Sequence, residues 1–138
     1  MGKDLDPVCE VRLQLAVLSL EQTAEELSAM LGTTATKLWR TGESILGDSP
    51  ARHKENGWAL VLTGPELNRD PDRAVRNLLD SLPSAAFRSL PPSCEVQLSI
   101  GLTGHRARPG LYLSAETLAR LSAIRASLDI DTYDLTGS

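Results

Sequence analysis

The sequence predicts an α+β fold in which helices cover one face of a mainly antiparallel sheet. Two stretches, 8–18 and 94–102, alternate apolar and polar residues, which is typical of half-buried strands. Helix start signals lie between them, at Thr23 and at Asp70. The expected order is β-α-β-β-α-β followed by α-β. Because the first six elements have the ferredoxin-like order, we expect a ferredoxin-like core with an added C-terminal α-β unit.

The first strand is expected at 8–18 and the first helix at 23–31. The apolar side of the strand should face the core: Cys9, Val11, Leu13, Leu15 and Val17. Thr23 and Glu26 have the spacing of a capping box, in which each side chain accepts from a free backbone N–H of the other residue. Gly32 should end the helix, because glycine adopts the left-handed conformation at low cost.

Two further strands are expected at 36–40 and 58–62, which are rich in residues that favour β-structure. The stretch between them, 41–57, contains Gly, Ser, Pro and charged residues, so it is expected to form a long loop. The two strands should therefore pair with each other through this loop.

The second helix has the clearest start signal, with Asp70 as N-cap and Pro71 at the first helical position. Its buried stripe is aliphatic and consists of Val75, Leu78, Leu79 and Leu82. Pro83 should stop or kink the helix, and a further turn should pack Phe87 inward. The preceding Thr63-Gly64-Pro65 is predicted to be a plain turn.

The C-terminal part should contain a strand at 94–102, a helix capped by Ser114 and a last strand at 128–133. The helix should bury an aliphatic face made of Leu118, Leu121 and Ile124. In a ferredoxin-like sheet, the strand at 94–102 lies beside the first strand and runs antiparallel to it.

One domain is expected over 1–138, with an ordered core at 7–134, since no linker divides a chain of this length. Cys9 and Cys94 begin two neighbouring antiparallel strands, so they should lie at opposite ends of them. Roughly eight residues at about 3.3 Å each separate the two. A disulfide spans at most about 7 Å between Cα atoms, so both thiols are expected to stay free.

The composition favours a cytoplasmic protein. A formal net charge of −4 argues against nonspecific nucleic-acid binding, which depends on Lys and Arg neutralising phosphates. The first residues lack the pattern of a signal peptide, and no apolar run approaches the length needed to span a membrane. We therefore expect neither a membrane nor a nucleic acid as partner.

Short motifs occur in a fixed order along nearly the whole chain: Leu31-Gly32, Thr36, Trp39, Gly42-Glu43, Gly57-Trp58, Leu98-Ser99-Ile100 and Asp129-Ile130-Asp131-Thr132-Tyr133. In this ordered set the chain resembles a bacterial family that is catalogued as domain of unknown function 4279. The family commonly has Pro before the Thr that follows its first helix, whereas Ala35 stands there in this chain. The resemblance implies a small stand-alone or modular α+β domain, and it implies no catalytic residues.

The leading candidate site combines two tryptophans with an Arg–Glu pair at neighbouring strand ends: Trp39, Arg40, Glu43 and Trp58. Only 4% of the residues are aromatic, so two tryptophans close together need an explanation. They could stack on a planar ligand while Arg40 holds an anion or a carboxylate. The structural alternative is that one tryptophan fills the core and that Arg40 and Glu43 form a surface ion pair.

Two other charged clusters are weaker candidates. His105 and Arg106, together with the basic stretch 52–54, could form an anion or nucleic-acid surface, although the two loops should leave opposite ends of the sheet. Asp129 and Asp131 share one face of the last strand, but two carboxylates are too few for a cation site. A charged strand that resists edge-to-edge aggregation is the favoured interpretation, so no metal is expected.

Catalysis is not expected, because no His or Cys occurs in a motif that supplies a nucleophile, a base and an orienting group. We therefore expect no catalytic residues and no cofactor. The favoured function is a noncatalytic binding or interaction module that meets a protein partner or a small ligand through its open sheet face or a sheet edge. By analogy of fold, it would inhibit or neutralise a partner protein. The alternative is a small-molecule sensor or enzyme that uses Asp131 and the loop at His105.

Overall fold

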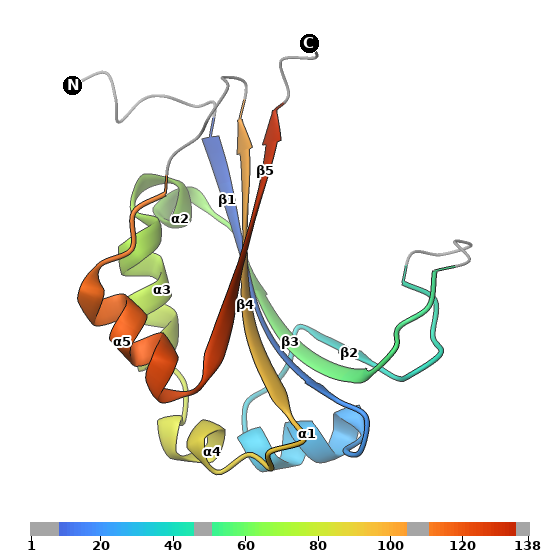
Figure 1. Cartoon of the computed structure of the whole chain (residues 1–138). Helices are drawn as coiled ribbons and strands as arrows, with labels where there is room; N and C mark the ends of the chain where they lie inside the picture. Colours follow the sequence, from blue (N-terminus) through green and yellow to red (C-terminus); the bar gives the residue numbers. More distant parts are fainter. Residues whose placement is uncertain (1–8, 46–50, 105–110, 135–138) are drawn as a thin grey trace, which may run out of the picture.

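The computed structural model describes residues 9–45, 51–104 and 111–134. Its helices gather on one face of a twisted sheet, and the opposite face is left open (Figure 1). In chain order the elements are β1 (Cys9–Ser19), α1 (Ala24–Leu31), β2 (Lys37–Trp39), β3 (Asn56–Leu62), α2 (Pro65–Arg69), α3 (Pro71–Asp80), α4 (Ser84–Arg88), β4 (Glu95–Gly104), α5 (Ala115–Ala123) and β5 (Ala126–Asp134).

The five strands form one sheet in the order β2-β3-β1-β4-β5. The pairs β2–β3, β3–β1 and β1–β4 are antiparallel, whereas β4–β5 is parallel. The predicted α+β class is therefore confirmed, with a sheet that is mixed. The parallel pair arises because α5 lies between β4 and β5 in the chain, and a crossover of this kind allows two neighbouring strands to run in the same direction.

The two alternating stretches of the sequence lie side by side, as predicted. Leu13 pairs with Ile100 and Leu15 with Leu98 in the antiparallel β1–β4 ladder. Cys9 pairs with Gly104 at one end of this ladder, while Cys94 precedes β4 at the other end and is free. The predicted separation of the two cysteines is thus confirmed.

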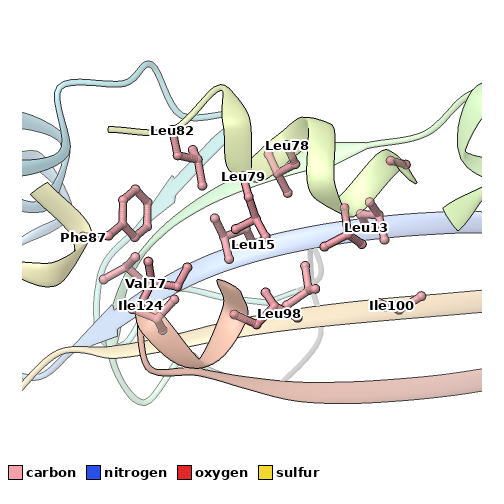
Figure 2. Packing of buried hydrophobic residues seen from close by; sticks show 14 of the residues in the cluster. Leu13, Leu15, Val17, Leu78, Leu79, Leu82, Phe87, Leu98, Ile100 and Ile124 are labelled. Carbon is pink, nitrogen blue, oxygen red and sulfur yellow. The ribbon is translucent and has the colours of Figure 1, made fainter. Parts of the chain in front are cut away.

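The core fills the space between the helices and the covered face of the sheet. Leu13 and Leu15 of β1 meet Leu78 and Leu79 of α3 there (Figure 2). Leu13 and Leu15 are fully buried. Complete burial of such a side chain stabilises the fold by about 1.5–3 kcal/mol, so this aliphatic layer is the main source of stability.

The predicted helix boundaries follow from local chemistry. The capping box of Thr23 and Glu26 is present, and Gly32 ends α1 with a φ of 63°. Asp70 caps α3 by accepting from the backbone N–H of Arg73 at 3.1 Å. Phe87 of α4 is buried, as expected. These signals act within a few residues, so they can be recognised without knowledge of the tertiary structure.

Two predictions about helices were wrong. The stretch predicted as a turn contains the start of α2, because Pro65 fits the first helical position and Leu67 is buried against the core. In α5, Leu118 is 47% exposed, whereas Leu121 is buried as predicted. Thr117 is fully buried instead, because its hydroxyl donates a hydrogen bond to Asp72 of α3 at 2.7 Å. A tertiary contact therefore rotates the buried face away from Leu118.

Candidate functional site

A hollow of about 910 Å³ lies on the open face of the sheet, on the side of β2. We call residues 40–45 and 51–55, in the connection between β2 and β3, the arm; it bends away from the sheet (Figure 1). Four of its residues line the hollow and so form one wall: Glu43, Ser44, Ile45 and His53. The sheet supplies the floor through β1 and β2. The lining residues are Arg12, Gln14, Thr36, Lys37, Leu38, Trp39, Glu43, Ser44, Ile45 and His53.

Hydrogen bonds hold the base of the arm in place. Backbone hydrogen bonds run from Gly42 N–H to the His53 carbonyl at 2.8 Å and from His53 N–H to the Glu43 carbonyl at 2.9 Å. Asn56 fixes the base to the sheet by accepting from the N–H of Thr41 at 2.9 Å and by donating to the Gln22 carbonyl at 3.0 Å. These bonds give the wall of the hollow a defined position.

Trp39 joins the arm to the sheet. Its indole stacks on the imidazole of His53, with ring centroids 4.8 Å apart and planes 20° apart. The indole also covers Gly57 of the neighbouring strand, where an added Cβ would overlap with Cε2 and Cζ2 of Trp39. Glycine at position 57 therefore leaves the space that the indole of Trp39 occupies. Trp39 is half-buried, as expected for a residue with this bridging role.

Trp58 does not belong to this site, and its prediction as a ligand-stacking residue is corrected. It pairs with Val17 in the β1–β3 ladder, points to the covered face and is fully buried. Its ring meets Phe87 edge to face at 6.0 Å, and its Nε1–H donates to the Thr33 carbonyl at 3.3 Å. Trp39 pairs with Gly57, one residue away, so the two tryptophans point to opposite faces of the sheet.

Arg40 and Glu43 do not pair through their side chains. The carboxylate of Glu43 accepts a hydrogen bond from the backbone N–H of Arg40 at 2.7 Å and so closes the turn at the start of the arm. The Arg40 guanidinium instead lies 3.6 Å from Glu25, and both side chains are more than 60% exposed. Glu43 lines the hollow, whereas Arg40 does not.

The floor of the hollow is cationic. Arg12 and Lys37 project from β1 and β2, and neither forms an ion pair with any residue of the described ranges. Arg12 donates one long hydrogen bond, 3.4 Å, to Gln14. The hollow thus offers two cationic donors for an anion in a chain whose net charge is negative, against one carboxylate, Glu43, among its described lining residues.

The remaining candidates lie elsewhere. Asp131 belongs to β5, and Gly101 of β4 separates it from Arg12. It is exposed and lies outside the hollow. His105 and Arg106 are outside the described residues. Within the described ranges, no three His, Cys, Asp or Glu side chains come together as metal ligands.

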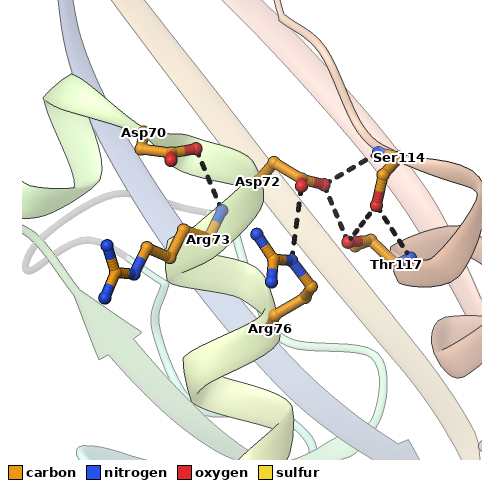
Figure 3. A network of polar contacts seen from close by, with 6 residues as sticks. All are labelled: Asp70, Asp72, Arg73, Arg76, Ser114 and Thr117. Carbon is orange, nitrogen blue, oxygen red and sulfur yellow. Dashed lines mark hydrogen bonds and ion pairs between the residues drawn. The ribbon is translucent and has the colours of Figure 1, made fainter.

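A polar network that the sequence did not reveal joins α3 to α5 (Figure 3). Asp72 is 7% exposed and accepts from the Ser114 N–H at 2.8 Å, the Thr117 hydroxyl at 2.7 Å and Arg76 Nε at 3.3 Å. The backbone hydrogen bond from Ser114 is the main cause that lowers the pKa of Asp72, and Thr117 and Arg76 act in the same direction against desolvation. The ionised carboxylate thus links the two helices. We call this network of Asp72, Arg76, Ser114 and Thr117 the clasp.

Cys94 is the one thiol whose surroundings the structure describes. Its Sγ lies 3.5 Å from the side-chain oxygen of Gln22. Desolvation by burial raises the pKa of Cys94. Because the thiolate is the reactive form, this thiol is a poor nucleophile at neutral pH.

Fold and site together define a small α+β domain with a helix-covered face and an open, hollowed face. The chain belongs to the family described as domain of unknown function (DUF4279), whose model matches residues 9–135. Neither a curated protein nor a solved structure matches the chain. Among the described residues, the helices are too short or too polar to cross a membrane.

Proposed function

We propose that this chain is a noncatalytic binding module that holds a small anion in the hollow on its open sheet face. The observation that supports this function is the placement of Arg12 and Lys37, without ion-pair partners in the described ranges, on the floor of a hollow of about 910 Å³. Small-molecule sites commonly enclose about 300–1,000 Å³. The aliphatic side chain of Ile45 adds an apolar contact beside the cations.

Two features favour binding over catalysis. His53, the imidazole that lines the hollow, is stacked against Trp39 and so helps to hold the arm in place. The thiol of Cys94 lies outside the hollow, and burial raises its pKa. We therefore expect the fixed cations Arg12 and Lys37 to meet the charge of the ligand.

Two finer assignments are also proposals, the first supported by the strand pairing and the second by the sequence. We assign β1 to β4, with their intervening helices, to a ferredoxin-like arrangement, because the order β2-β3-β1-β4 with all three pairs antiparallel is the one expected from β-α-β-β-α-β. We also place the protein in the bacterial cytoplasm, on the resemblance and the composition of its sequence.

Trp39 provides the test of the binding site, because Trp58 is fully buried and Trp39 is the tryptophan that solvent can reach. Acrylamide should quench part of the emission of the wild type, and Trp39→Phe should remove that part. Phosphate, citrate and adenosine monophosphate are then titrated up to 10 mM. We expect at least one of them to change the Trp39 emission and to protect it from acrylamide.

The variant Arg12→Ala/Lys37→Ala should weaken this binding by about tenfold or more, since a hydrogen bond to a charged group contributes about 1.5–3 kcal/mol. Arg73→Ala is the matched control, because Arg73 is an exposed arginine of α3, on the covered side of the sheet. No change of emission with any of the three anions, or equal affinity in the double variant, would contradict the proposed site.

A further inference from the structure

The second surface of interest is the outer edge of β5. Within the described residues, β5 has one strand neighbour, β4, and its other side carries no strand. Its nine residues extend over about 30 Å at roughly 3.3 Å per residue. The opposite edge of the sheet is the three-residue β2, so β5 offers by far the longer row of backbone groups to an added strand.

The side chains along this edge alternate between two chemistries. Leu128 and Ile130 pair with Leu98 and Ile100 and so point to the covered face, yet they remain 38% and 44% exposed. Leu118 of α5, 47% exposed, and Leu128 both line a shallow groove between α5 and β5. These residues form an apolar ledge that the helices leave uncovered.

The opposite side of the same strand is acidic. Asp129 and Asp131 pair with Ser99 and Gly101 and therefore lie on the open face, where both are exposed. Neither forms an ion pair within the described ranges. The edge thus presents carboxylates two residues apart, with an aliphatic side chain between them on the other face.

A second copy of this chain is a poor occupant for the edge. Antiparallel pairing of β5 with itself over its full length is centred on Ile130, and this register sets Asp129 of each copy opposite Asp131 of the other. Like charges directly opposite each other on a sheet are destabilising. The same two carboxylates favour a strand of opposite charge.

We propose that β5 is a receptor for an extended segment of a partner protein in which Lys or Arg alternates with aliphatic residues. The segment would extend the sheet through backbone hydrogen bonds. Its cations would face Asp129 and Asp131, and its aliphatic side chains would cover Leu128, Ile130 and Leu118. This surface is independent of the proposed anion site, which lies on the side of β2, so either can fail without the other.

The probe is a fluorescein-labelled peptide with the sequence Thr-Val-Lys-Val-Lys-Val-Thr, and the readout is fluorescence anisotropy with the full chain. Three matched peptides serve as controls: one with Glu in place of Lys, one with the two cations adjacent, and one N-methylated at every Lys and Val, so that none of these residues can donate a backbone hydrogen bond. We expect the first peptide to bind and each control to bind more weakly. Amide hydrogen exchange should slow in β5 and not in β2.

The charge-reversal variant Asp129→Lys/Asp131→Lys should lose about 2- to 30-fold in affinity for the Lys peptide, the range expected for two cross-strand charge pairs, and should gain affinity for the Glu peptide. Asp129→Asn/Asp131→Asn should lie between it and the wild type, and thermal melting verifies that both variants fold. Absence of binding at millimolar peptide, equal affinity in the charge-reversal variant, or protection of β2 in place of β5 would overturn the proposal.

Discussion

The two faces of the sheet use the same residue type for opposite purposes. Trp58 on the covered face fills the core against Phe87, whereas Trp39 on the open face holds the arm against Gly57. Only one position in the β2–β3 ladder separates them. Because side chains alternate between faces along a strand, this single step decides whether an aromatic ring serves packing or shapes a surface.

The largest expected effect tests this contrast directly. Trp58→Ala should lower the free energy of unfolding by about 3–5 kcal/mol, because it leaves a large cavity in a packed core. Trp39→Ala should cost about 1 kcal/mol, the usual contribution of one aromatic stacking pair. Urea unfolding followed by circular dichroism measures both values. Similar losses in the two variants would show that the faces do not differ as described.

The covered face also depends on the polar clasp at Asp72. Asp72→Asn should destabilise the protein at neutral pH by about 1.5–3 kcal/mol, as expected when hydrogen bonds to a charged group are weakened. The pKa of Asp72 is lowered in the folded state, so its contribution to stability is complete above the unfolded pKa and is lost as the pH falls through the folded one.

The gap between wild type and Asp72→Asn should therefore narrow as the pH is lowered from about 5 towards 2, since an unperturbed Asp has a pKa of about 3.9. Urea unfolding across this range measures the gap. Asp131→Asn is the matched control, as it alters an exposed carboxyl on the open face. A gap for Asp72→Asn that stays constant with pH would contradict the assignment of the clasp.

On the open face, the contact between the Trp39 indole and Gly57 leads to a third prediction. Gly57→Ala should cost about 1–3 kcal/mol, because the new methyl group overlaps with the indole. The same change in a Trp39→Ala background should cost much less, since the overlapping ring is gone. A double-mutant cycle measures this coupling. If Gly57→Ala costs the same in both backgrounds, the indole does not determine the residue at position 57.

The elements set by local signals could be predicted from the sequence. Thr23, Asp70 and Ser114 all cap helices as expected, and the two alternating stretches pair with each other. The missed start of α2 had a local signal in Pro65, whereas the other failures depend on tertiary geometry. Whether Trp39 or Trp58 points to the core follows from the register of β3, which no short-range pattern specifies.

The clasp also could not be predicted from the sequence, because its residues lie far apart in the chain. Asp72 and Thr117 are 45 residues apart, and an acidic residue in the first turn of a helix is ordinary in itself. Nothing near Asp72 indicates that it is to be buried. The cationic floor of the hollow is similar, because Arg12 and Lys37 line one hollow only when β1 and β2 are placed in one sheet.

The smallest expected effect separates Arg40 from Glu43, which the sequence presented as a pair. Arg40→Ala should change the free energy of unfolding by less than about 0.5 kcal/mol, because its ion pair with Glu25 is exposed and 3.6 Å long. Glu43→Ala should cost about 0.5–1.5 kcal/mol, since it removes a 2.7 Å hydrogen bond to the backbone. It should also increase acrylamide quenching of Trp39, because the turn that starts the arm loosens, whereas Arg40→Ala should leave quenching unchanged. Equal quenching in the two variants would mean that the arm keeps its position without the Glu43 side chain, held by its backbone hydrogen bonds to His53 and by the Trp39–His53 stack.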